Sequence, residues 1–175
     1  MMHRLLSDRS GVAAAEFAMS LPFLVLLYLG GYQLSDAISA YRKVAVTTRT
    51  VADLTSQYTS VSDDDVNTIL DASTQVLYPY KVSAAKVLVS QIKIDASGNA
   101  LVDWSFGKNV TKLTSNTAFT LPASIRTPNT FVIVASIDYT YTPLAAYGML
   151  GTIPFKDQII MGPRASVKVD CRTCN

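Results

Sequence analysis

Hydrophobic and polar positions follow different patterns in successive parts of the chain. From Phe17 to Ser35 nineteen residues carry no formal charge, and beyond them apolar positions recur every three or four residues up to Tyr58. That spacing is typical of one face of an α-helix, and about 20 apolar residues in a helix cross the roughly 30 Å hydrocarbon core of a bilayer. The pattern predicts one helix from about Val12 to Tyr58, with a transmembrane half and an amphipathic half.

The amphipathic half has a stripe of apolar and small residues. The stripe comprises Leu34, Ala37, Ile38, Tyr41, Val44, Ala45, Thr48, Val51, Ala52, Thr55 and Tyr58. Charged residues fall largely between these positions, so the stripe is expected to pack on the protein's own domain. Pro22 and Gly30–Gly31 interrupt the apolar half; membrane helices tolerate such residues, which would each cost roughly 1 to 3 kcal/mol in a soluble helix. A buried helix of a soluble protein is therefore the poorer interpretation of the apolar half.

A second, shorter helix is predicted after Ser62, a typical N-cap residue. The next three residues, Asp63–Asp65, place carboxylates where the free N–H groups and the helix dipole stabilise negative charge. Pro79 ends this helix. An acidic triplet also suggests a cation site, but a calcium loop needs ligands at alternating positions and a closing glutamate twelve along. Capping is therefore the preferred interpretation.

After the second helix the periodicity changes to the alternation of β-strands. The run 86–95 is strand-like, residues 96–99 have the composition of a turn, and a second strand follows, which together predict a hairpin. The side chains expected on one face of the second strand are Val102, Trp104 and Phe106. The alternation of the first strand slips near Ser90–Gln91, which indicates a β-bulge there.

Two more strands complete the predicted sheet. The cleanest alternation covers residues 131–141, and a last strand is predicted at 164–170. The residues of this last strand expected to point inward are Ala165, Val167 and Val169. Between the strands, segment 107–129 is predicted to be a long polar loop, and the apolar, glycine-punctuated segment 143–163 to be partly helical. The fold class is therefore α+β, a long N-terminal helix packed on a small antiparallel sheet of about four strands.

Composition and charge limit the class of protein. A chain of 175 residues has room for one modest domain, and a formal net charge of +2 is too weak to indicate a nucleic-acid interface. Only 16% of the residues are charged and 49% are hydrophobic, whereas soluble proteins have roughly 25% charged residues. Part of the surface is therefore expected to face lipid.

The charges that flank the apolar run predict its orientation in a bacterial inner membrane. His3, Arg4 and Arg9 precede the run, and basic residues in short flanks stay cytoplasmic. The expected segments are a cytoplasmic leader at 1–11, a transmembrane helix at 12–35, an amphipathic stem at 36–61 and a periplasmic α+β domain at 62–175. An ordinary secretory signal is the alternative, but its apolar core would be about 7–15 residues and a small-residue cleavage site would follow it.

A carboxylate stands at the threshold of the apolar run. Glu16 follows Gly11 by five residues and precedes Phe17, and ionisable residues in a membrane segment usually have a function. The spacing of glycine, glutamate, aromatic residue and apolar run resembles the processing site of bacterial prepilins. The segment 11–34 is similar to the TadE-like minor pilins of tight adherence (Tad) systems, and residues 134–169 look like the C-terminal half of that family.

This resemblance implies a pilin-like fold and a processing step. A prepilin peptidase on the cytoplasmic side would cut between Gly11 and Val12, and Glu16 would then pair with the freed N-terminal amine of a neighbouring subunit. The alternative is that Glu16 is an interfacial carboxylate without a partner and without a specific function. Phe17 departs from the tyrosine that is usual in Flp pilins. Major Flp pilins are much shorter than this chain, so the resemblance points to a minor component.

The two cysteines offer a rival chemistry. Cys171 and Cys174 form a C-x-x-C pair, which in the periplasm is expected to be oxidised to a small disulfide loop, with intermolecular bridging as the second interpretation. A redox enzyme places such a pair at the start of a helix, and a zinc site needs about four ligands. No histidine follows the membrane run and no phosphate-binding glycine motif is present. The protein is therefore expected not to be an enzyme and to use no metal or other cofactor.

The expected function is that of a minor pilin that joins or primes a Tad-type pilus and supports surface attachment. Its expected partners are inner-membrane lipid, the prepilin peptidase, other major and minor pilins and the Tad secretion platform, and nucleic acid is not among them. The alternative is an uncleaved, membrane-anchored periplasmic scaffold or ligand-binding protein.

Overall fold

The computed structural model describes residues 10–143 and 151–173. The leader residues 1–9, part of the segment expected to be partly helical (144–150) and the second cysteine, Cys174, lie outside the described residues.

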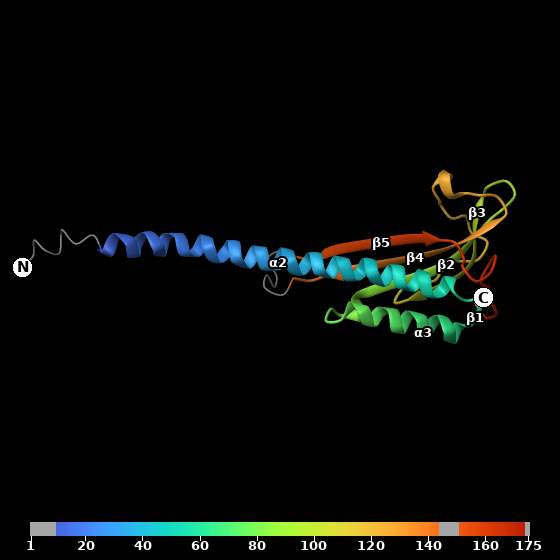
Figure 1. Ribbon diagram of the computed structural model, residues 1–175, viewed down its shortest axis with the longest axis horizontal. Coiled ribbons are helices and arrows are strands. Elements are labelled where there is room, and N and C mark those ends of the chain that lie inside the picture. The colour runs from blue at the N-terminus through green and yellow to red at the C-terminus, as the bar shows by residue number, and fades with distance from the viewer. Residues whose placement is uncertain (1–9, 144–150, 174–175) are drawn as a thin grey trace, which may run out of the picture. The chain divides into compact units, whose positions relative to one another are not determined.

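Two compact units divide the chain. The first comprises residues 1–38 and 143–151, and the second comprises residues 39–142 and 152–175. The N-terminal helix α2, Ser10–Ser56, contributes its first half to the first unit and its second half to the second unit (Figure 1). We call these parts the first half and the second half of α2 below.

The second half of α2 buries the middle of the stripe that the sequence predicts, whereas Leu34, Ile38, Tyr41 and Tyr58 of that stripe are exposed. Its fully buried residues are Ala40, Val44, Thr47, Thr48, Val51, Ala52, Thr55 and Ser56. The buried hydroxyls remain satisfied because they donate to carbonyl oxygens one turn earlier, for example Thr48 to Val44 at 2.9 Å and Thr55 to Val51 at 2.8 Å. Small and β-branched side chains on this stripe let the helix approach the sheet closely.

Helix α3, Asp63–Thr74, starts as predicted. A short strand β1, Ser60–Val61, leads into Ser62, whose side chain accepts a hydrogen bond from the backbone N–H of Asp65. The carboxylate of Asp65 in turn accepts from the backbone N–H of Ser62 at 2.9 Å, which completes a capping box. The helix continues into the 3₁₀ turns η1, Gln75–Leu77, and η2, Val82–Ala84. The acidic triplet therefore caps a helix, as its sequence indicates.

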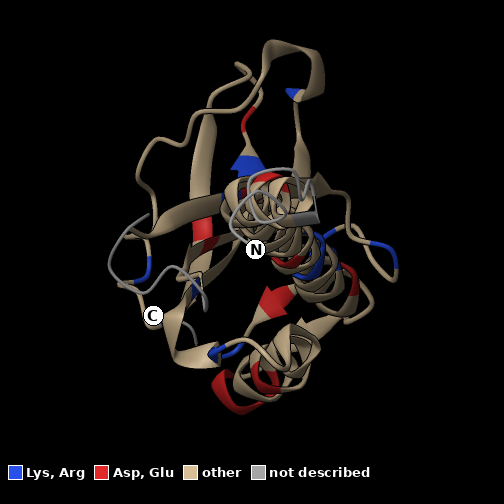
Figure 2. Ribbon diagram, turned by 90° about the vertical axis from the view of Figure 1, so that its left-hand side faces the viewer, with Lys and Arg blue, Asp and Glu red and all other residues tan. Residues whose placement is uncertain are grey.

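Four antiparallel strands form the main sheet in the order β3-β2-β4-β5. Their bounds are β2 Ala85–Ile94, β3 Ala100–Lys108, β4 Thr130–Tyr141 and β5 Ile153–Met161. The second half of α2 and the helix α3 lie on the same face of this sheet (Figure 2), and α3 carries a cluster of acidic residues. The predicted fold class, α+β with a long helix packed on a four-stranded antiparallel sheet in a pilin-like arrangement, is confirmed.

The bulge predicted near Ser90–Gln91 is present, and it contradicts the predicted side-chain directions in β3. The pairing of β2 with β3 shifts between Gln91 and Ile92, where Gln91 pairs with Trp104 but Ile92 pairs with Val102. Because neighbouring residues of a strand point to opposite faces, Val102 and Trp104 lie on opposite faces of the sheet. The expectation that Val102, Trp104 and Phe106 share a face was wrong, since Asp103 is an extra residue in β3.

The fourth strand lies earlier in the chain than predicted. Strand β5 falls in the segment expected to be partly helical, and the predicted strand at 164–170 is reduced to β6, Asp170–Cys171, which pairs in parallel with β1. Val169 is fully buried as expected, but Ala165 is exposed and Val167 is 78% exposed. Strand β5 was missed because Ile159, Ile160 and Met161 are all partly buried, which removes the alternation that marks a strand with one solvated face.

The second face of the sheet is covered at one end by the long loop between β3 and β4. A core there contains Ile92, Ile94, Ala100, Val102, Leu121 and Val134, with Leu113, Phe119 and Ile125 of the loop packed against it. The loop contains the 3₁₀ turn η3, Ala123–Ile125, and backbone hydrogen bonds join it to β3. The loop predicted to lie on the surface therefore contributes apolar side chains to the core.

Candidate functional site: the exposed half of the N-terminal helix

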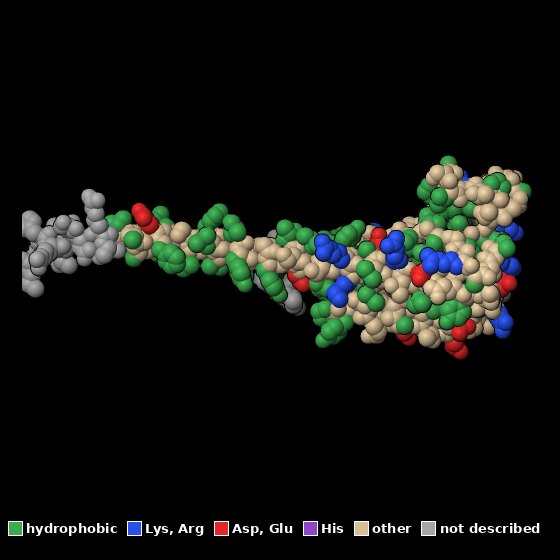
Figure 3. Space-filling view, viewed as in Figure 1, with side chains coloured by type: hydrophobic (Ala, Val, Ile, Leu, Met, Phe, Trp, Pro, Cys, Tyr) green, Lys and Arg blue, Asp and Glu red, His purple; other side chains and the backbone are tan. Residues whose placement is uncertain are grey.

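The first half of α2 leaves its apolar side chains uncovered. All residues from 11 to 32 are exposed, and Figure 3 shows hydrophobic side chains spread along this part of the helix. The large side chains involved are Val12, Phe17, Met19, Leu21, Phe23, Leu24, Val25, Leu26, Leu27, Tyr28, Leu29 and Tyr32, between 41% and 83% exposed. Burial of such a side chain stabilises a protein by about 1.5–3 kcal/mol, so water is a costly environment for the whole segment.

This part of the helix has the length and the polarity of a membrane span. Helix α2 is the one helix in the described part of the chain that is long and apolar enough to cross a bilayer. Its most apolar window has a mean hydropathy of 1.9. The hydroxyl of Ser20 donates to the carbonyl oxygen of Phe17 at 3.0 Å, so that polar group is satisfied inside the helix. Pro22 lies within the helix without ending it.

The four residues singled out for processing and assembly lie together in the first two turns of α2. Gly11, Val12, Glu16 and Phe17 are all helical and exposed. Val12 and Glu16 are four residues apart, so they lie on the same helix face, one turn from each other. Within the described part of the chain, no side chain forms an ion pair or hydrogen bond with Glu16.

The described residues place no steric demand for glycine at position 11. A Cβ atom placed there would meet no heavy atom within 4 Å, and the same holds for Gly30 and Gly31. Its backbone is helical, a conformation that any residue adopts, and glycine in a helix interior costs about 1 kcal/mol relative to alanine.

The predicted cysteine pair is only partly described. Cys171 is half-buried in β6, where it pairs with Val61 of β1, and Cys174 lies outside the described residues. The C-terminal segment around Cys171 is held by a hydrogen bond from the hydroxyl of Thr173 to the carboxylate of Asp63 at 2.7 Å. The disulfide between Cys171 and Cys174 stays a prediction.

Sequence reasoning missed a buried polar cluster that closes the helix-covered face of the sheet. The side-chain oxygen of Gln91 accepts from the backbone N–H of Val169 at 2.7 Å, and the indole N–H of Trp104 donates to the carbonyl oxygen of Val169 at 2.8 Å. The amide nitrogen of Gln91 donates to Asp103, the bulge residue, at 2.6 Å. A glutamine in the middle of an apolar strand was the available signal. The cluster fixes the C-terminal segment and has a structural role.

Two carboxyl groups of the second unit have a lowered pKa, each for a local reason. Hydrogen bonds from the hydroxyl and the backbone N–H of Ser62 lower the pKa of Asp65 at the start of α3. Hydrogen bonds from the side chain and backbone of Asn99 lower the pKa of Asp95 in the β2–β3 turn. Both shifts follow from a cap and a turn, so they indicate folding rather than catalysis.

A shallow groove lies on the second face of the sheet. Its volume is about 460 Å³, and its lining includes Lys86, Asp138 and Lys156, which form a row across three neighbouring strands. Lys156 forms an ion pair with Asp138 at 3.2 Å, and both side chains are well exposed. The row is therefore a solvated face of the sheet.

The comparisons with known proteins bear on the exposed helix. A family model described as TadE-like protein matches residues 11–53, which include the whole uncovered segment and most of the second half of α2. Neither the curated proteins nor the solved structures gave a match. The match agrees with the resemblance found in the sequence: over residues 11–53, the chain is similar to the TadE-like family.

Proposed function

We propose that this protein is a minor pilin or pilus-assembly protein of a Tad-type, type IVb-like pilus. The first half of α2 holds it in the bacterial inner membrane, with the N-terminus in the cytoplasm and the second unit in the periplasm, until it joins or primes a filament for surface adhesion. One observation carries the proposal: the family match begins at Gly11 and includes the entire apolar segment that the described chain leaves uncovered.

The physical reason is the need to cover that segment in two environments. Lipid covers it before assembly. A helix of this kind leaves the membrane only when other apolar surfaces replace the lipid, and identical or related helices in a filament provide such surfaces. The partners are therefore inner-membrane lipid, other major and minor pilins and the Tad secretion platform.

Processing by a prepilin peptidase accounts for Gly11. The folded chain places no steric demand for glycine there, whereas a peptidase that cuts between Gly11 and Val12 selects for the smallest side chain at its cleavage site. Cleavage frees the amine of Val12 at the start of the helix. The protein itself acts as a structural subunit and performs no catalysis in this scheme.

The carboxylate of Glu16 then has a partner in a neighbouring subunit. If two helices pack in parallel with a shift of about four residues, roughly 6 Å along the axis, the amine of Val12 in one lies beside Glu16 in the other. An unpaired carboxylate in such an apolar core is expensive, and a nearby ammonium group offsets much of that cost. The pair thus fixes the axial register of the subunits.

Intact-mass measurement of the protein from its native cells tests the processing step. We expect a mature chain that begins at Val12. Gly11→Leu should remain uncleaved, whereas the matched substitution Gly30→Leu, at a glycine with equally open surroundings, should be cleaved normally. A wild-type mass that retains residues 1–11 would contradict the proposal and favour the uncleaved membrane-anchored periplasmic scaffold or ligand-binding protein.

A further inference from the structure

One end of the second unit is built from aromatic rings contributed by three elements and by the connection between η1 and η2. The rings of Tyr41 in α2 and Phe155 in β5 are 5.7 Å apart, and those of Phe155 and Tyr141 in β4 are 5.6 Å apart. Tyr80, between η1 and η2, is 6.2 Å from Tyr141. We call these four residues together with Tyr78 the aromatic end of the unit. Edge-to-face and stacked pairs of this kind hold their rings in fixed positions.

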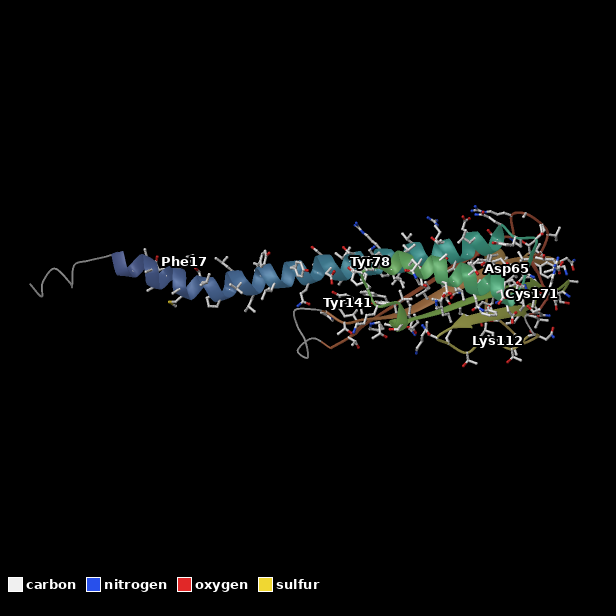
Figure 4. All side chains as sticks on the ribbon, turned by 90° about the horizontal axis from the view of Figure 1, so that it is seen from below. Phe17, Asp65, Tyr78, Lys112, Tyr141 and Cys171 are labelled. Carbon is white, nitrogen blue, oxygen red and sulfur yellow. The ribbon has the colours of Figure 1, made fainter. Side chains whose placement is uncertain are left out.

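Tyr78 projects from the aromatic end into the surroundings. It is 77% exposed, the highest value among the exposed large apolar residues of α3 and the connection that follows it. Figure 4 shows Tyr78 and Tyr141 at one end of this unit, and Asp65 and Cys171 at the other. A tyrosine held out from a rigid aromatic cluster is typical of a contact surface.

The aromatic end lies where the chain leaves for the apolar segment. The ammonium group of Lys43 in α2 donates to the carbonyl oxygen of Val76, two residues before Tyr78, at 3.3 Å. Tyr41 follows Asp36, the first charged residue after the apolar run, by five residues, which corresponds to about 7.5 Å of helix. The polar layer of each leaflet is roughly 5–8 Å thick, so Tyr41 lies at the level of the headgroups when the apolar run fills the hydrocarbon core.

Cations accompany the tyrosines at the aromatic end. Arg42 and Lys81 are exposed and adjoin Tyr41 and Tyr80 in the chain. The opposite end carries charges of both signs, the acidic first turn of α3 and the exposed Arg172. Tyrosine with lysine or arginine is the composition of residues that settle at a membrane interface, because a ring enters the boundary of the acyl chains while its hydroxyl and the cations stay with the phosphates.

We infer that the aromatic end of the second unit is a bilayer-contact surface, in which Tyr78 inserts among phospholipid headgroups while the protein is stored in the membrane. The inference rests on the proposed membrane storage and adds a second attachment to it. Departure from the membrane requires this contact to break as well as the helix to be extracted.

Tryptophan quenching in lipid tests the contact with the full chain. The test uses three variants, Tyr78→Trp, Val167→Trp and Leu26→Trp. Each is placed in vesicles of phosphatidylcholine and phosphatidylglycerol whose acyl chains carry bromine atoms, which quench tryptophan fluorescence, either near the headgroup or near the chain end. Val167 is the matched control because its exposure, 78%, is close to the 77% of Tyr78 and it follows the segment bonded to Ser56, the last residue of α2. Trp104, the one tryptophan of the chain, is 3% exposed and gives a common background.

We expect bromine near the headgroup to quench Tyr78→Trp more than bromine near the chain end, and neither to quench Val167→Trp beyond the wild-type background. Leu26→Trp reports insertion of α2 and should be quenched most by bromine near the chain end. Quenched Leu26→Trp with unquenched Tyr78→Trp would overturn the contact and leave the proposed function intact. Unquenched Leu26→Trp would overturn membrane storage itself, and equal quenching of Tyr78→Trp and Val167→Trp would also refute a specific contact.

Discussion

The two halves of α2 have the same backbone and opposite surroundings. In the first half every residue from 11 to 32 is exposed, whereas in the second half a full stripe from Ala40 to Ser56 is buried against the protein's own sheet. The first half uses large apolar side chains on all sides. The second half buries alanine, valine, threonine and serine on one side and carries Arg42 and Arg49 on its exposed side.

This difference separates a completed interface from an incomplete one. The buried stripe belongs to a core that forms within one chain, so its residues determine whether the second unit folds. The uncovered half has no complement in the described chain, and under the proposed function its residues determine where the protein resides and what it joins. Equivalent substitutions in the two halves should therefore have different consequences.

The largest effect on the free energy of unfolding is expected from one member of a pair of aspartate substitutions. Val51→Asp places a carboxylate at a position that is 0% exposed, and we expect the free energy of unfolding of the second unit to fall by about 4 kcal/mol or more. Leu26→Asp should leave that free energy unchanged but weaken insertion, since an aspartate at the centre of a membrane helix costs about 2.5–3.5 kcal/mol. Urea unfolding followed by Trp104 fluorescence and membrane fractionation measure the two effects. Similar unfolding of both variants would contradict the division of the helix.

The next effect concerns the segment that closes the helix-covered face. Gln91→Ala removes the acceptor for the backbone N–H of Val169, and we expect a loss of about 1–3 kcal/mol because that N–H stays buried without its partner. Gln57→Ala is the matched control, since its exposed bond to Asp53 is a surface contact and should change stability little. The same urea titration compares them. Equal losses would mean that Gln91 is not an anchor for the C-terminal segment.

The capping box should give a smaller, pH-dependent effect. Ser62→Ala is expected to destabilise the second unit by about 1 kcal/mol. Because hydrogen bonds from Ser62 lower the folded-state pKa of Asp65, the stability they provide is fully present above the ordinary aspartate pKa of about 3.9 and is lost as the pH falls through the folded-state value. Thermal unfolding at neutral pH and at successively lower pH should therefore show the variant approaching wild type in acid. A difference that grows in acid would contradict this account.

The smallest expected effect is at the end of the packed half. The guanidinium of Arg164 contacts the carboxylate of Asp53 at 2.6 Å, but the arginine side chain is 61% exposed. Exposed pairs contribute about 0.2–1 kcal/mol and are screened by salt, so Arg164→Ala should shift the urea midpoint slightly and less at high salt. A shift that persists undiminished in high salt would indicate packing rather than charge.

The sequence was sufficient for features that local chemistry determines. The stripe around Val44 and Val51, the cap at Ser62 and the alternation of β4 follow from periodicity and hydrogen-bonding side chains within a few residues. The helix ends at Ser56 rather than near Tyr58. Strand β5 could not be predicted because its last three residues, Ile159, Ile160 and Met161, are all apolar and interrupt the alternation.

Contacts between residues far apart in the chain could also not be predicted from the sequence. The change of face at Val102 depends on a bulge whose extra residue belongs to the partner strand, and the buried bonds between Gln91 and Val169 join residues far apart in the chain. The candidate site residues Gly11, Val12, Glu16 and Phe17 could be identified from the sequence because the pattern that marks them is their spacing along one helix. Their roles concern other molecules, so the fold of one chain cannot assign them.

The central claim is that neighbouring helices cover the uncovered half of α2, with Glu16 as their charged contact. The most direct test is to measure pilus assembly in a strain whose only copy of this protein carries Glu16→Gln. The variant keeps the size of the side chain but not its charge, and Glu16→Asp, shorter by one methylene, serves as the charged control. At matched membrane levels, sheared-pilus yield and surface attachment should be low for Glu16→Gln and intermediate for Glu16→Asp, with cleavage and the melting temperature of the second unit unchanged. Wild-type piliation by Glu16→Gln would contradict the claim.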